Sequence, residues 1–254
     1  MSEQLQWLVG PHAVSGALAN DPERIEQMVV AVNRPNAKLR DLLAEAEQRG
    51  IAVRKMAADK LEKLVGSSHH QGIAVQYQAA SGLSETALLE LIAAQIDAGA
   101  APLILALDEV QDPRNLGACL RSAEAAGVMA VVTPKHRAAA LTPAARKAAA
   151  GGAEVVPVVQ AGNLARCLRS IADLGVWLTG LAGEGEQSIY DVDFRPPSMI
   201  LAGNEEKGLR RLTREHCDHL VRIPMVGSVS SLNVSVAASI ALFEALRQRG
   251  NVPH

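Results

Sequence analysis

The chain has 254 residues, of which 48% are hydrophobic and only 2% aromatic, and its formal net charge at pH 7 is −2. This length accommodates one large domain or two ordinary domains whose cores are packed mainly from aliphatic side chains. The slightly acidic balance excludes a surface that is uniformly positive for nucleic-acid binding, so any basic surface has to be local.

The cysteines and the N-terminal residues indicate the compartment. Cys119, Cys167 and Cys217 are odd in number, widely spaced and without a CxxC pair, which disfavours a disulfide framework and a zinc site. Residues 1–10 lack the basic and apolar regions of a secretion signal, and the apolar runs are too short to cross a bilayer. We therefore expect a cytoplasmic protein with reduced thiols and no membrane contact.

The first third of the chain predicts a small α/β domain. Apolar runs at 27–32 and 51–55 predict short strands, and residues 38–49 have helical spacing between them. We assign residues 1–78 to this domain.

The next segment, residues 79–101, is expected to be a linker. It contains a break at Gly82, an amphipathic helix from Ser84 to about Ala98, and an exit rich in Gly and Pro. Residues 102–254 then form the second predicted domain.

In the second domain, apolar runs alternate with helical stretches. This rhythm predicts a mostly parallel sheet with helices on both faces. Thr142 followed by Pro143 predicts a helix start, because Thr caps a helix and Pro suits its first turn. The predicted strands are 103–107, 128–132, 155–159, 176–181 and 198–202.

A first polar segment follows the predicted strand 103–107. It reads DEVQDPRNLG over residues 108–117, and Arg121 follows about one and a half turns into the next helix. Ligands of open α/β sheets bind beyond the carboxyl ends of strands, so Asn115 and Arg121 are site candidates. The alternative is a surface helix capped by Asn115, with Arg121 in solvent.

A second polar segment reads LAGNEEKGL over residues 201–209, after the last predicted strand. Gly203 allows a ligand to approach the backbone closely, and the Glu205 carboxylate is placed to orient a cationic neighbour. The alternative is a helix N-terminus decorated with favourable acidic side chains.

A third segment, residues 223–237, reads IPMVGSVSSLNVSVA and runs directly into an apolar helix that extends to Leu246. A loop rich in Gly and Ser exposes main-chain groups at a helix entrance, where they can bind a polar small molecule. The helix is apolar on nearly all sides through Phe243, so we expect it to be buried on more than one face.

Together, these three segments resemble the three motifs of the SpoU (TrmH) family of RNA ribose 2′-O-methyltransferases. The resemblance is strong over about residues 103–250. Residues 7–77 resemble more weakly the ribosomal-protein-like substrate-binding domain of the members that act on large-subunit (23S) ribosomal RNA. Glu206 stands where most members have Gly.

The resemblance implies a trefoil-knotted (SPOUT) α/β methyltransferase domain preceded by a small ribosomal-protein-like α/β domain. No GxGxxG sequence follows a predicted strand, so a usual Rossmann cofactor site is not expected. The implied cofactor is S-adenosylmethionine. By the resemblance, it is held by the backbone around Gly203, Ile223 and Leu232, with Met225 and Gly227 lining the pocket.

The resemblance also implies the catalytic residues, which are Arg121, Asn115, Glu205, Ser231 and Asn233. A guanidinium with a pKa above ~12 is a poor base, so we interpret Arg121 as stabilising the developing 2′-oxyanion and the neighbouring phosphate. In this hypothesis Glu205 and Asn115 hold that guanidinium. Asn233 and Ser231 position the ribose.

We therefore expect an enzyme that methylates a guanosine 2′-hydroxyl in 23S rRNA and acts as a homodimer. A tRNA-directed member of the family and a non-catalytic RNA-binding ribosome-assembly factor remain alternatives. No metal is expected, because His12, His69 and His70 lack a carboxylate or Cys at ligand spacing. Candidate phosphate contacts are the basic residues Arg114, Arg121, Lys135, Arg137, Arg146, Lys147, Lys207, Arg210, Arg211 and Arg214.

Overall fold

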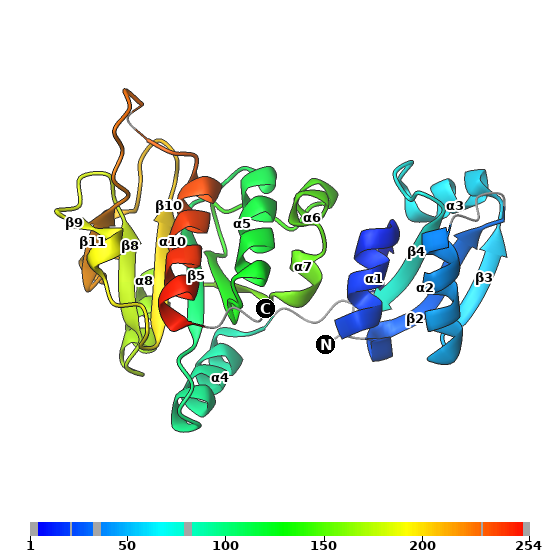
Figure 1. The fold of residues 1–254 in the computed structure, drawn as a ribbon, viewed down its shortest axis with the longest axis horizontal. Coiled ribbons are helices and arrows are strands. Elements are labelled where there is room, and N and C mark those ends of the chain that lie inside the picture. Colours follow the sequence, from blue (N-terminus) through cyan, green and yellow to red (C-terminus); the bar gives the residue numbers. More distant parts are fainter. Residues whose placement is uncertain (1–4, 21, 33–36, 79–82, 230, 251–254) are drawn as a thin grey trace. The chain divides into compact units, whose positions relative to one another are not determined.

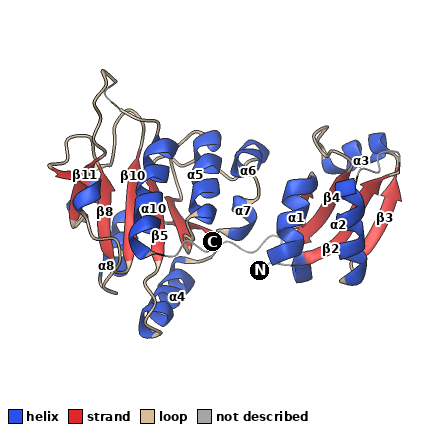
Figure 2. Ribbon diagram, in the orientation of Figure 1, coloured by secondary structure: helices blue, strands red, loops and turns tan. Residues whose placement is uncertain are grey.

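The structure is a computed structural model that describes residues 5–20, 22–32, 37–78, 83–229 and 231–250. The chain divides into two compact units, Met1–Ser81 and Gly82–His254. Figures 1 and 2 show that each unit has its own sheet and its own covering helices.

The N-terminal unit is built on a four-stranded sheet of order β1-β4-β2-β3. β2 pairs parallel with β3 and antiparallel with β4, and β4 pairs antiparallel with β1. The predicted strands 27–32 and 51–55 are β2 and β3, and the predicted helix 38–49 is α2. The elements are β1 (Leu5–Val9), α1 (Pro11–Asn20), η1 (Pro22–Arg24), β2 (Ile25–Ala31), α2 (Ala37–Gln48), β3 (Ala52–Met56), α3 (Ala58–Val65) and β4 (Ile73–Gln78).

Both faces of this sheet are covered because successive side chains of β2 point to opposite sides. Met28 and Val30 are buried in one apolar cluster with side chains of α1 and α2. Val29 is buried in a second cluster with Leu61 of α3. Figure 2 shows the helices of this unit beside its sheet.

The second unit contains a seven-stranded sheet within its described residues, in the order β7-β6-β5-β10-β8-β11-β9. Every strand pair in it is parallel, as the alternation of strands and helices predicts. The elements are α4 (Glu85–Asp97), β5 (Leu103–Asp108), α5 (Pro113–Ala125), β6 (Ala130–Pro134), α6 (Pro143–Ala149), α7 (Gly152–Val155), β7 (Val158–Ala161), α8 (Leu164–Ala172), β8 (Trp177–Leu181), β9 (Gln187–Ser188), η2 (Ile189–Asp191), β10 (Ser198–Gly203), α9 (Arg211–Glu215), β11 (His219–Arg222) and α10 (Val234–Arg249).

The predicted strands correspond to β5, β6, β7, β8 and β10, with shifts at two of them. β6 begins two residues later than predicted, and β7 three residues later because residues 152–155 form the short helix α7. The helix start at Thr142 is confirmed, since Thr142 Oγ1 accepts a hydrogen bond from the Ala145 N–H at 3.3 Å.

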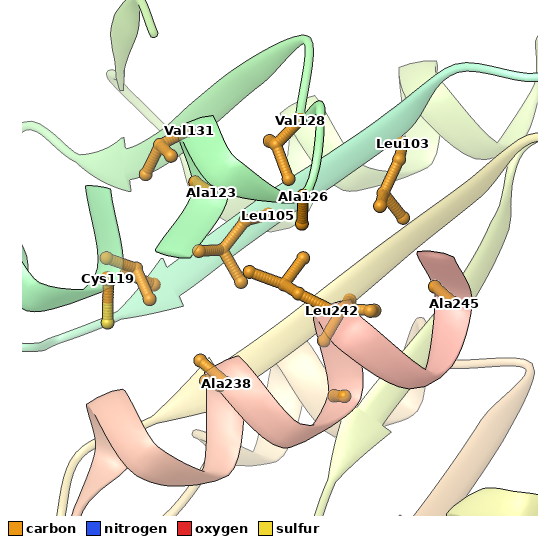
Figure 3. Packing of buried hydrophobic residues seen from close by; sticks show 14 of the residues in the cluster. Leu103, Leu105, Cys119, Ala123, Ala126, Val128, Val131, Ala238, Leu242 and Ala245 are labelled. Carbon is orange, nitrogen blue, oxygen red and sulfur yellow. The ribbon is translucent and has the colours of Figure 1, made fainter. Parts of the chain in front are cut away.

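Helices α5 and α10 cover one face of the sheet, and α4 and α8 cover the other. Leu105 of β5 is buried with Leu242 of α10 and Ala123 of α5, and Figure 3 shows these three side chains close together. Ile104, the neighbouring residue, is buried with residues of α4 and α8. β5 is therefore a central strand that is apolar on both faces.

The helix predicted within the linker packs into the second unit. α4 is capped by Ser84, whose Oγ accepts a hydrogen bond from the Ala87 N–H at 3.1 Å. Leu88 and Ile92 on this helix are fully buried. Its first residue, Glu85, accepts a hydrogen bond from the Gly162 N–H at 2.7 Å.

Helix α10 is fastened at its C-terminal end. The Arg249 guanidinium donates hydrogen bonds to the backbone carbonyls of Ala101, Phe194 and Pro196. Earlier in the helix, Val236 and Phe243 are 46% and 48% exposed, so the expected burial of more than one face is incomplete in the single chain.

In the described part of the chain, no helix is both long enough and apolar enough to span a membrane.

Candidate cofactor pocket and motif cluster

A cavity of about 150 Å³ opens at the carboxyl ends of β8, β10 and β11. This is the edge of an open parallel sheet at which ligands bind. The strand ends provide its floor, and the loops after β10 and β11 provide its walls. The lining residues are Leu181, Ala182, Gly183, Ala202, Gly203, Asn204, Glu205, Gly208, Val221, Ile223, Met225, Ser231, Leu232, Val234 and Ala237.

Four of the five residues predicted to bind the cofactor line this cavity. They are Gly203, Ile223, Met225 and Leu232. Gly227 does not line it and lies in an exposed part of the loop after β11. The second and third sequence segments therefore meet in space as expected.

The cavity is smaller than a complete site for a nucleoside-sized ligand. Pockets for drug-sized ligands begin at about 300 Å³, so a cavity of about 150 Å³ accommodates only part of such a ligand. The β11–α10 loop offers apolar surface, since Met225 and Val229 are exposed and Val226 has no measurable burial.

Gly203 is required by a close approach of backbone to backbone. A Cβ atom there would lie 2.2 Å from the Gly208 carbonyl carbon and 2.3 Å from the Leu209 nitrogen. The loop is closed by reciprocal backbone hydrogen bonds between Asn204 and Gly208 at 3.1 and 2.8 Å. The cavity wall at this point is therefore main chain, without a side chain that a ligand would have to avoid.

Three predicted catalytic side chains form a polar cluster beside the cavity. The Asn115 amide Nδ2 donates to Glu205 Oε1, and the Asn233 Nδ2 donates to Asn115 Oδ1 at 3.1 Å. We call Asn115, Glu205 and Asn233 the motif cluster, because each comes from a different sequence segment. Glu205 and Ser231 also line the cavity.

Asn115 reaches this cluster from inside helix α5. The N-cap of α5 is Asp112, whose Oδ1 accepts a hydrogen bond from the Arg114 N–H at 2.7 Å, and Pro113 begins the helix. The alternative in which Asn115 is the cap is therefore wrong. Its amide is left available for Glu205 and Asn233.

The structure does not bring Arg121 to the motif cluster. Six residues advance an α-helix by about 600°, which places Arg121 and Asn115 about 120° apart around α5. The Arg121 side chain is exposed and has no hydrogen bond or ion pair with any residue in the described ranges. Glu205 is bonded to the Asn115 amide instead.

The loop that carries Glu205 is anchored to the end of β5 by an ion pair that the sequence analysis did not identify. Asp108 is completely buried, and its carboxylate accepts from Arg210 Nε at 2.7 Å and from the Arg210 N–H at 3.0 Å. Asn204 Nδ2 donates to the Glu109 carbonyl at 3.2 Å. An acidic residue that ends a buried apolar strand was the available signal, because a buried carboxylate requires a partner.

The conformation of this loop accepts a residue with a side chain at position 206. The N–H of Glu206 and that of Lys207 donate to Asn204 Oδ1 at 3.0 and 3.3 Å, and the Glu206 side chain is exposed. Its φ lies outside the left-handed region, unlike that of Glu109 at 59°. The position therefore does not require the glycine common in the family.

The cysteines near the site are not nucleophiles at neutral pH. Burial, together with the negative charge of Glu205, raises the pKa of Cys119 to about 12. Burial likewise raises the pKa of Cys217 to about 12. Both thiols stay protonated, whereas the thiolate is the reactive form.

Family models match almost all of this architecture. Residues 102–243 match the SpoU rRNA Methylase family. The chain belongs to this family. Residues 7–82 match a second model, RNA 2′-O ribose methyltransferase substrate binding.

Individual relatives extend the match to nearly the whole chain. It is 49% identical to the 23S rRNA (guanosine-2′-O-)-methyltransferase RlmB of Xanthomonas axonopodis pv. citri over 98% of this chain and 99% of that protein. It is 46% identical to the protein of the same name from Pseudomonas syringae pv. tomato, with 97% of both chains covered.

Solved structures agree with the fold. The SpoU methyltransferase AviRb of Streptomyces viridochromogenes, in complex with AdoMet, superposes with a TM-score of 0.73 at 26% identity, covering 97% of this chain and 91% of that one. An AdoMet-bound rRNA methyltransferase from Sinorhizobium meliloti superposes with a TM-score of 0.72 at 25% identity, covering 96% and 87%. The family fold therefore binds the cofactor that the sequence implied.

Proposed function

We propose that this protein transfers a methyl group from S-adenosylmethionine to the ribose 2′-hydroxyl of a guanosine in 23S rRNA. Family membership and two near full-length relatives named for this reaction support the proposal. The observation that carries it is the motif cluster, in which Asn115, Glu205 and Asn233 meet at the rim of the cavity.

The cavity residues suit the nucleoside part of the cofactor. Gly203 offers bare main chain, and Ile223 and Leu232 offer apolar side chains on which a flat ring can lie. Met225 contributes a flexible apolar side chain at the same wall. When bound, the cofactor supplies a sulfonium methyl that is already a strong electrophile. Gly227 belongs to the proposed set through the loop that it shares with Met225.

The protein's contribution to the reaction is alignment and charge stabilisation. Asn233 and Ser231 position the ribose, and the hydrogen bond from Asn115 holds the Glu205 carboxylate in one orientation. In a single chain the exposed Arg121 guanidinium does not join the motif cluster, so we propose that it acts at the site of the second chain of a homodimer, on the RNA phosphate and the developing 2′-oxyanion.

RNA binding is assigned to both units. The N-terminal unit matches a substrate-binding model, and we propose residues 1–78 as the RNA-binding domain, 79–101 as the connecting segment and 102–254 as the catalytic domain. Several basic residues in the catalytic domain are already engaged in ion pairs, among them Arg146 with Glu154 and Arg210 with Asp108. The exposed candidates for phosphate contacts without an ion pair to a described residue are Arg114, Arg121, Lys135, Lys147 and Lys207.

We further propose a homodimer that forms through α10. Val236 and Phe243 lie seven residues apart, on one side of that helix, and both are about half exposed. An apolar stripe of this kind favours a partner surface. Sedimentation velocity should give twice the chain mass, and Phe243→Asp should give the monomer. A wild-type monomer at micromolar concentration would contradict this assembly.

We also propose a trefoil knot and a cytoplasmic location. The knot is supported by the return of the chain from β11 to α10, which packs against α5 and the central strand β5. A crystal structure traced through residues 223–233 tests it. The location is supported by the three free cysteines, and cell fractionation tests it.

The reaction is tested with the purified full chain, labelled S-adenosylmethionine, and either 23S rRNA or bulk tRNA. We expect label only on 23S rRNA, as 2′-O-methylguanosine at one position by mass spectrometry, and none with the Asn233→Ala variant. The same mark should be absent from rRNA of cells that lack the gene. Label on tRNA alone, or RNA binding without label, would replace the proposal with a tRNA enzyme or a non-catalytic binding protein.

A further inference from the structure

Ser235 donates two hydrogen bonds to Asn233, a member of the motif cluster. It lies in the first turn of α10, two residues after Asn233. Both its backbone N–H, at 2.9 Å, and its hydroxyl, at 2.6 Å, donate to Asn233 Oδ1. Two donors on one oxygen leave the Asn233 Nδ2 pointing away from the helix.

The orientation of the Asn233 amide determines the orientation of the Asn115 amide. The Asn233 Nδ2 donates to Asn115 Oδ1 at 3.1 Å, so the Asn115 Nδ2 is the group that faces Glu205. The oxygen and the NH₂ of an amide have nearly the same size, so sterics alone do not select one orientation. The orientation of each amide is therefore determined by the hydrogen-bond donors and acceptors around it.

A reversed amide would set two oxygens against each other. If Asn233 turned over, its Oδ1 would face Asn115, and Asn115 would either oppose it or turn as well. In the second case the Asn115 oxygen would face the Glu205 carboxylate, which accepts hydrogen bonds but donates none when ionised. The Ser235 hydroxyl begins this series of hydrogen bonds, and it favours the orientation in which Asn233 Oδ1 faces the helix.

We propose that Ser235 is a positioning residue for methyl transfer, whose hydroxyl adds to its backbone N–H in fixing the amides of Asn233 and Asn115 so that Glu205 is held as an acceptor at the cavity rim. This role rests on the proposed function. Ser235 does not line the cavity, so it acts through Asn233 and not by binding the cofactor.

Ser239, one turn later in the same helix, provides a matched control. Its hydroxyl donates to the Ser235 carbonyl at 2.6 Å and lies 2.7 Å from the Ser122 hydroxyl of α5. It therefore joins α5 to α10 but contacts no member of the motif cluster. Loss of this hydroxyl should weaken the packing of the two helices without changing the direction of the amides.

The experiment compares Ser235→Ala, Ser235→Thr and Ser239→Ala in the full chain. We expect Ser235→Ala to lower the single-turnover methylation rate about tenfold, the value of one hydrogen bond expressed as a rate. Its affinity for S-adenosylmethionine, measured by calorimetry, should stay within about twofold, because Ser235 lies outside the cavity. Ser235→Thr keeps the hydroxyl and should recover most of the rate. Ser239→Ala should lower the thermal midpoint and keep the rate.

A second readout does not require activity. The side-chain amide ¹⁵N–¹H signals of Asn115 and Asn233 should each be a single pair in the wild type and in Ser239→Ala, and should broaden or double in Ser235→Ala. An inactive wild type with this pattern would refute the proposed function but would still show that Ser235 fixes the two amides. Equal losses of rate in Ser235→Ala and Ser239→Ala, a Ser235→Ala variant at full rate, or unchanged amide signals would overturn the role of Ser235.

Discussion

The cavity wall and the motif cluster lie side by side but are built in different ways. The wall at Gly203 is main chain, where a single Cβ would collide with Gly208. The motif cluster consists of side chains that reach one another across 90 and 118 residues of sequence. A wall of main chain depends on exact backbone spacing, whereas the cluster depends on which atom donates. Substitutions in the two regions should therefore have different signatures.

The largest effect on the methylation rate is expected from Arg121, which lies outside both the cavity wall and the motif cluster. Arg121→Ala should lower the methylation rate by about 100- to 1,000-fold, the usual cost of removing a group that stabilises a developing oxyanion. Its affinity for S-adenosylmethionine should change by no more than a few fold, because Arg121 does not line the cavity. Calorimetry and single-turnover kinetics measure the two quantities. A comparable loss of cofactor affinity would place Arg121 in the binding wall.

A substitution in the wall should affect binding and stability together. In Gly203→Ala the new Cβ would lie 2.2 Å from a backbone carbon, so the Asn204–Gly208 loop has to move. We expect the free energy of unfolding to fall by about 3 kcal/mol and the affinity for the cofactor to fall at least about tenfold. Gly183→Ala is the stability control, because Gly183 lines the same cavity and its Cβ would meet nothing within 4 Å. Equal losses of stability in the two variants would contradict the steric explanation.

A substitution in the motif cluster should act through its donors and acceptors. Asn115→Asp keeps the shape but places a second carboxylate against Glu205, so the folded state should lose about 1 kcal/mol in urea unfolding. Adding Glu205→Gln supplies a new amide donor to Asp at 115 and should recover most of that loss. The double-mutant cycle gives the coupling directly. Additive losses would show that the two side chains do not interact.

The smallest effect is expected far from both regions, in the second half of α10. The hydrogen bonds from Arg247 lower the pKa of the Glu244 carboxyl below its usual value, so its ionised form stabilises the folded state. This contribution is fully present above the pKa that the Glu244 carboxyl has in the unfolded chain, about 4.3. It is lost as the pH falls through the lower pKa of the same carboxyl in the folded chain. Glu244→Gln should cost less than about 1 kcal/mol at pH 7, because Arg247 is largely exposed. Urea unfolding should show a larger difference at pH 7 than at pH 3, and methylation should be unchanged.

Elements that follow from local patterns were predicted well. Buried strands such as β5 and β10 are continuous apolar runs, and capped helix starts such as Thr142–Pro143 carry their own signal. Short elements were missed, among them β11 and α9, because four or five residues hold too little periodicity to be identified.

The site was predictable only in part. Motif resemblance identified the segments that meet at the cavity, and four of the five proposed cofactor residues line it. The contacts that order those segments were not predictable, since the Asp108–Arg210 pair joins residues 102 positions apart. Sequence spacing also suggested that Asn115 and Arg121 face one site, whereas helix geometry separates them by about 120°. Side-chain direction around a helix decides this point, and proximity in sequence does not.

The three carbonyl contacts of Arg249 have a consequence for how the catalytic unit matures on the ribosome. Ala101 lies two residues before β5, yet its carbonyl oxygen accepts a hydrogen bond from a residue 148 positions further along the chain. A nascent chain in which β5 and β10 have already been synthesised therefore still lacks the Arg249 hydrogen bonds to the carbonyls that precede these strands. A chain that ends before Arg249 should therefore form the sheet but leave the amino-terminal ends of β5 and β10 more open to proteases.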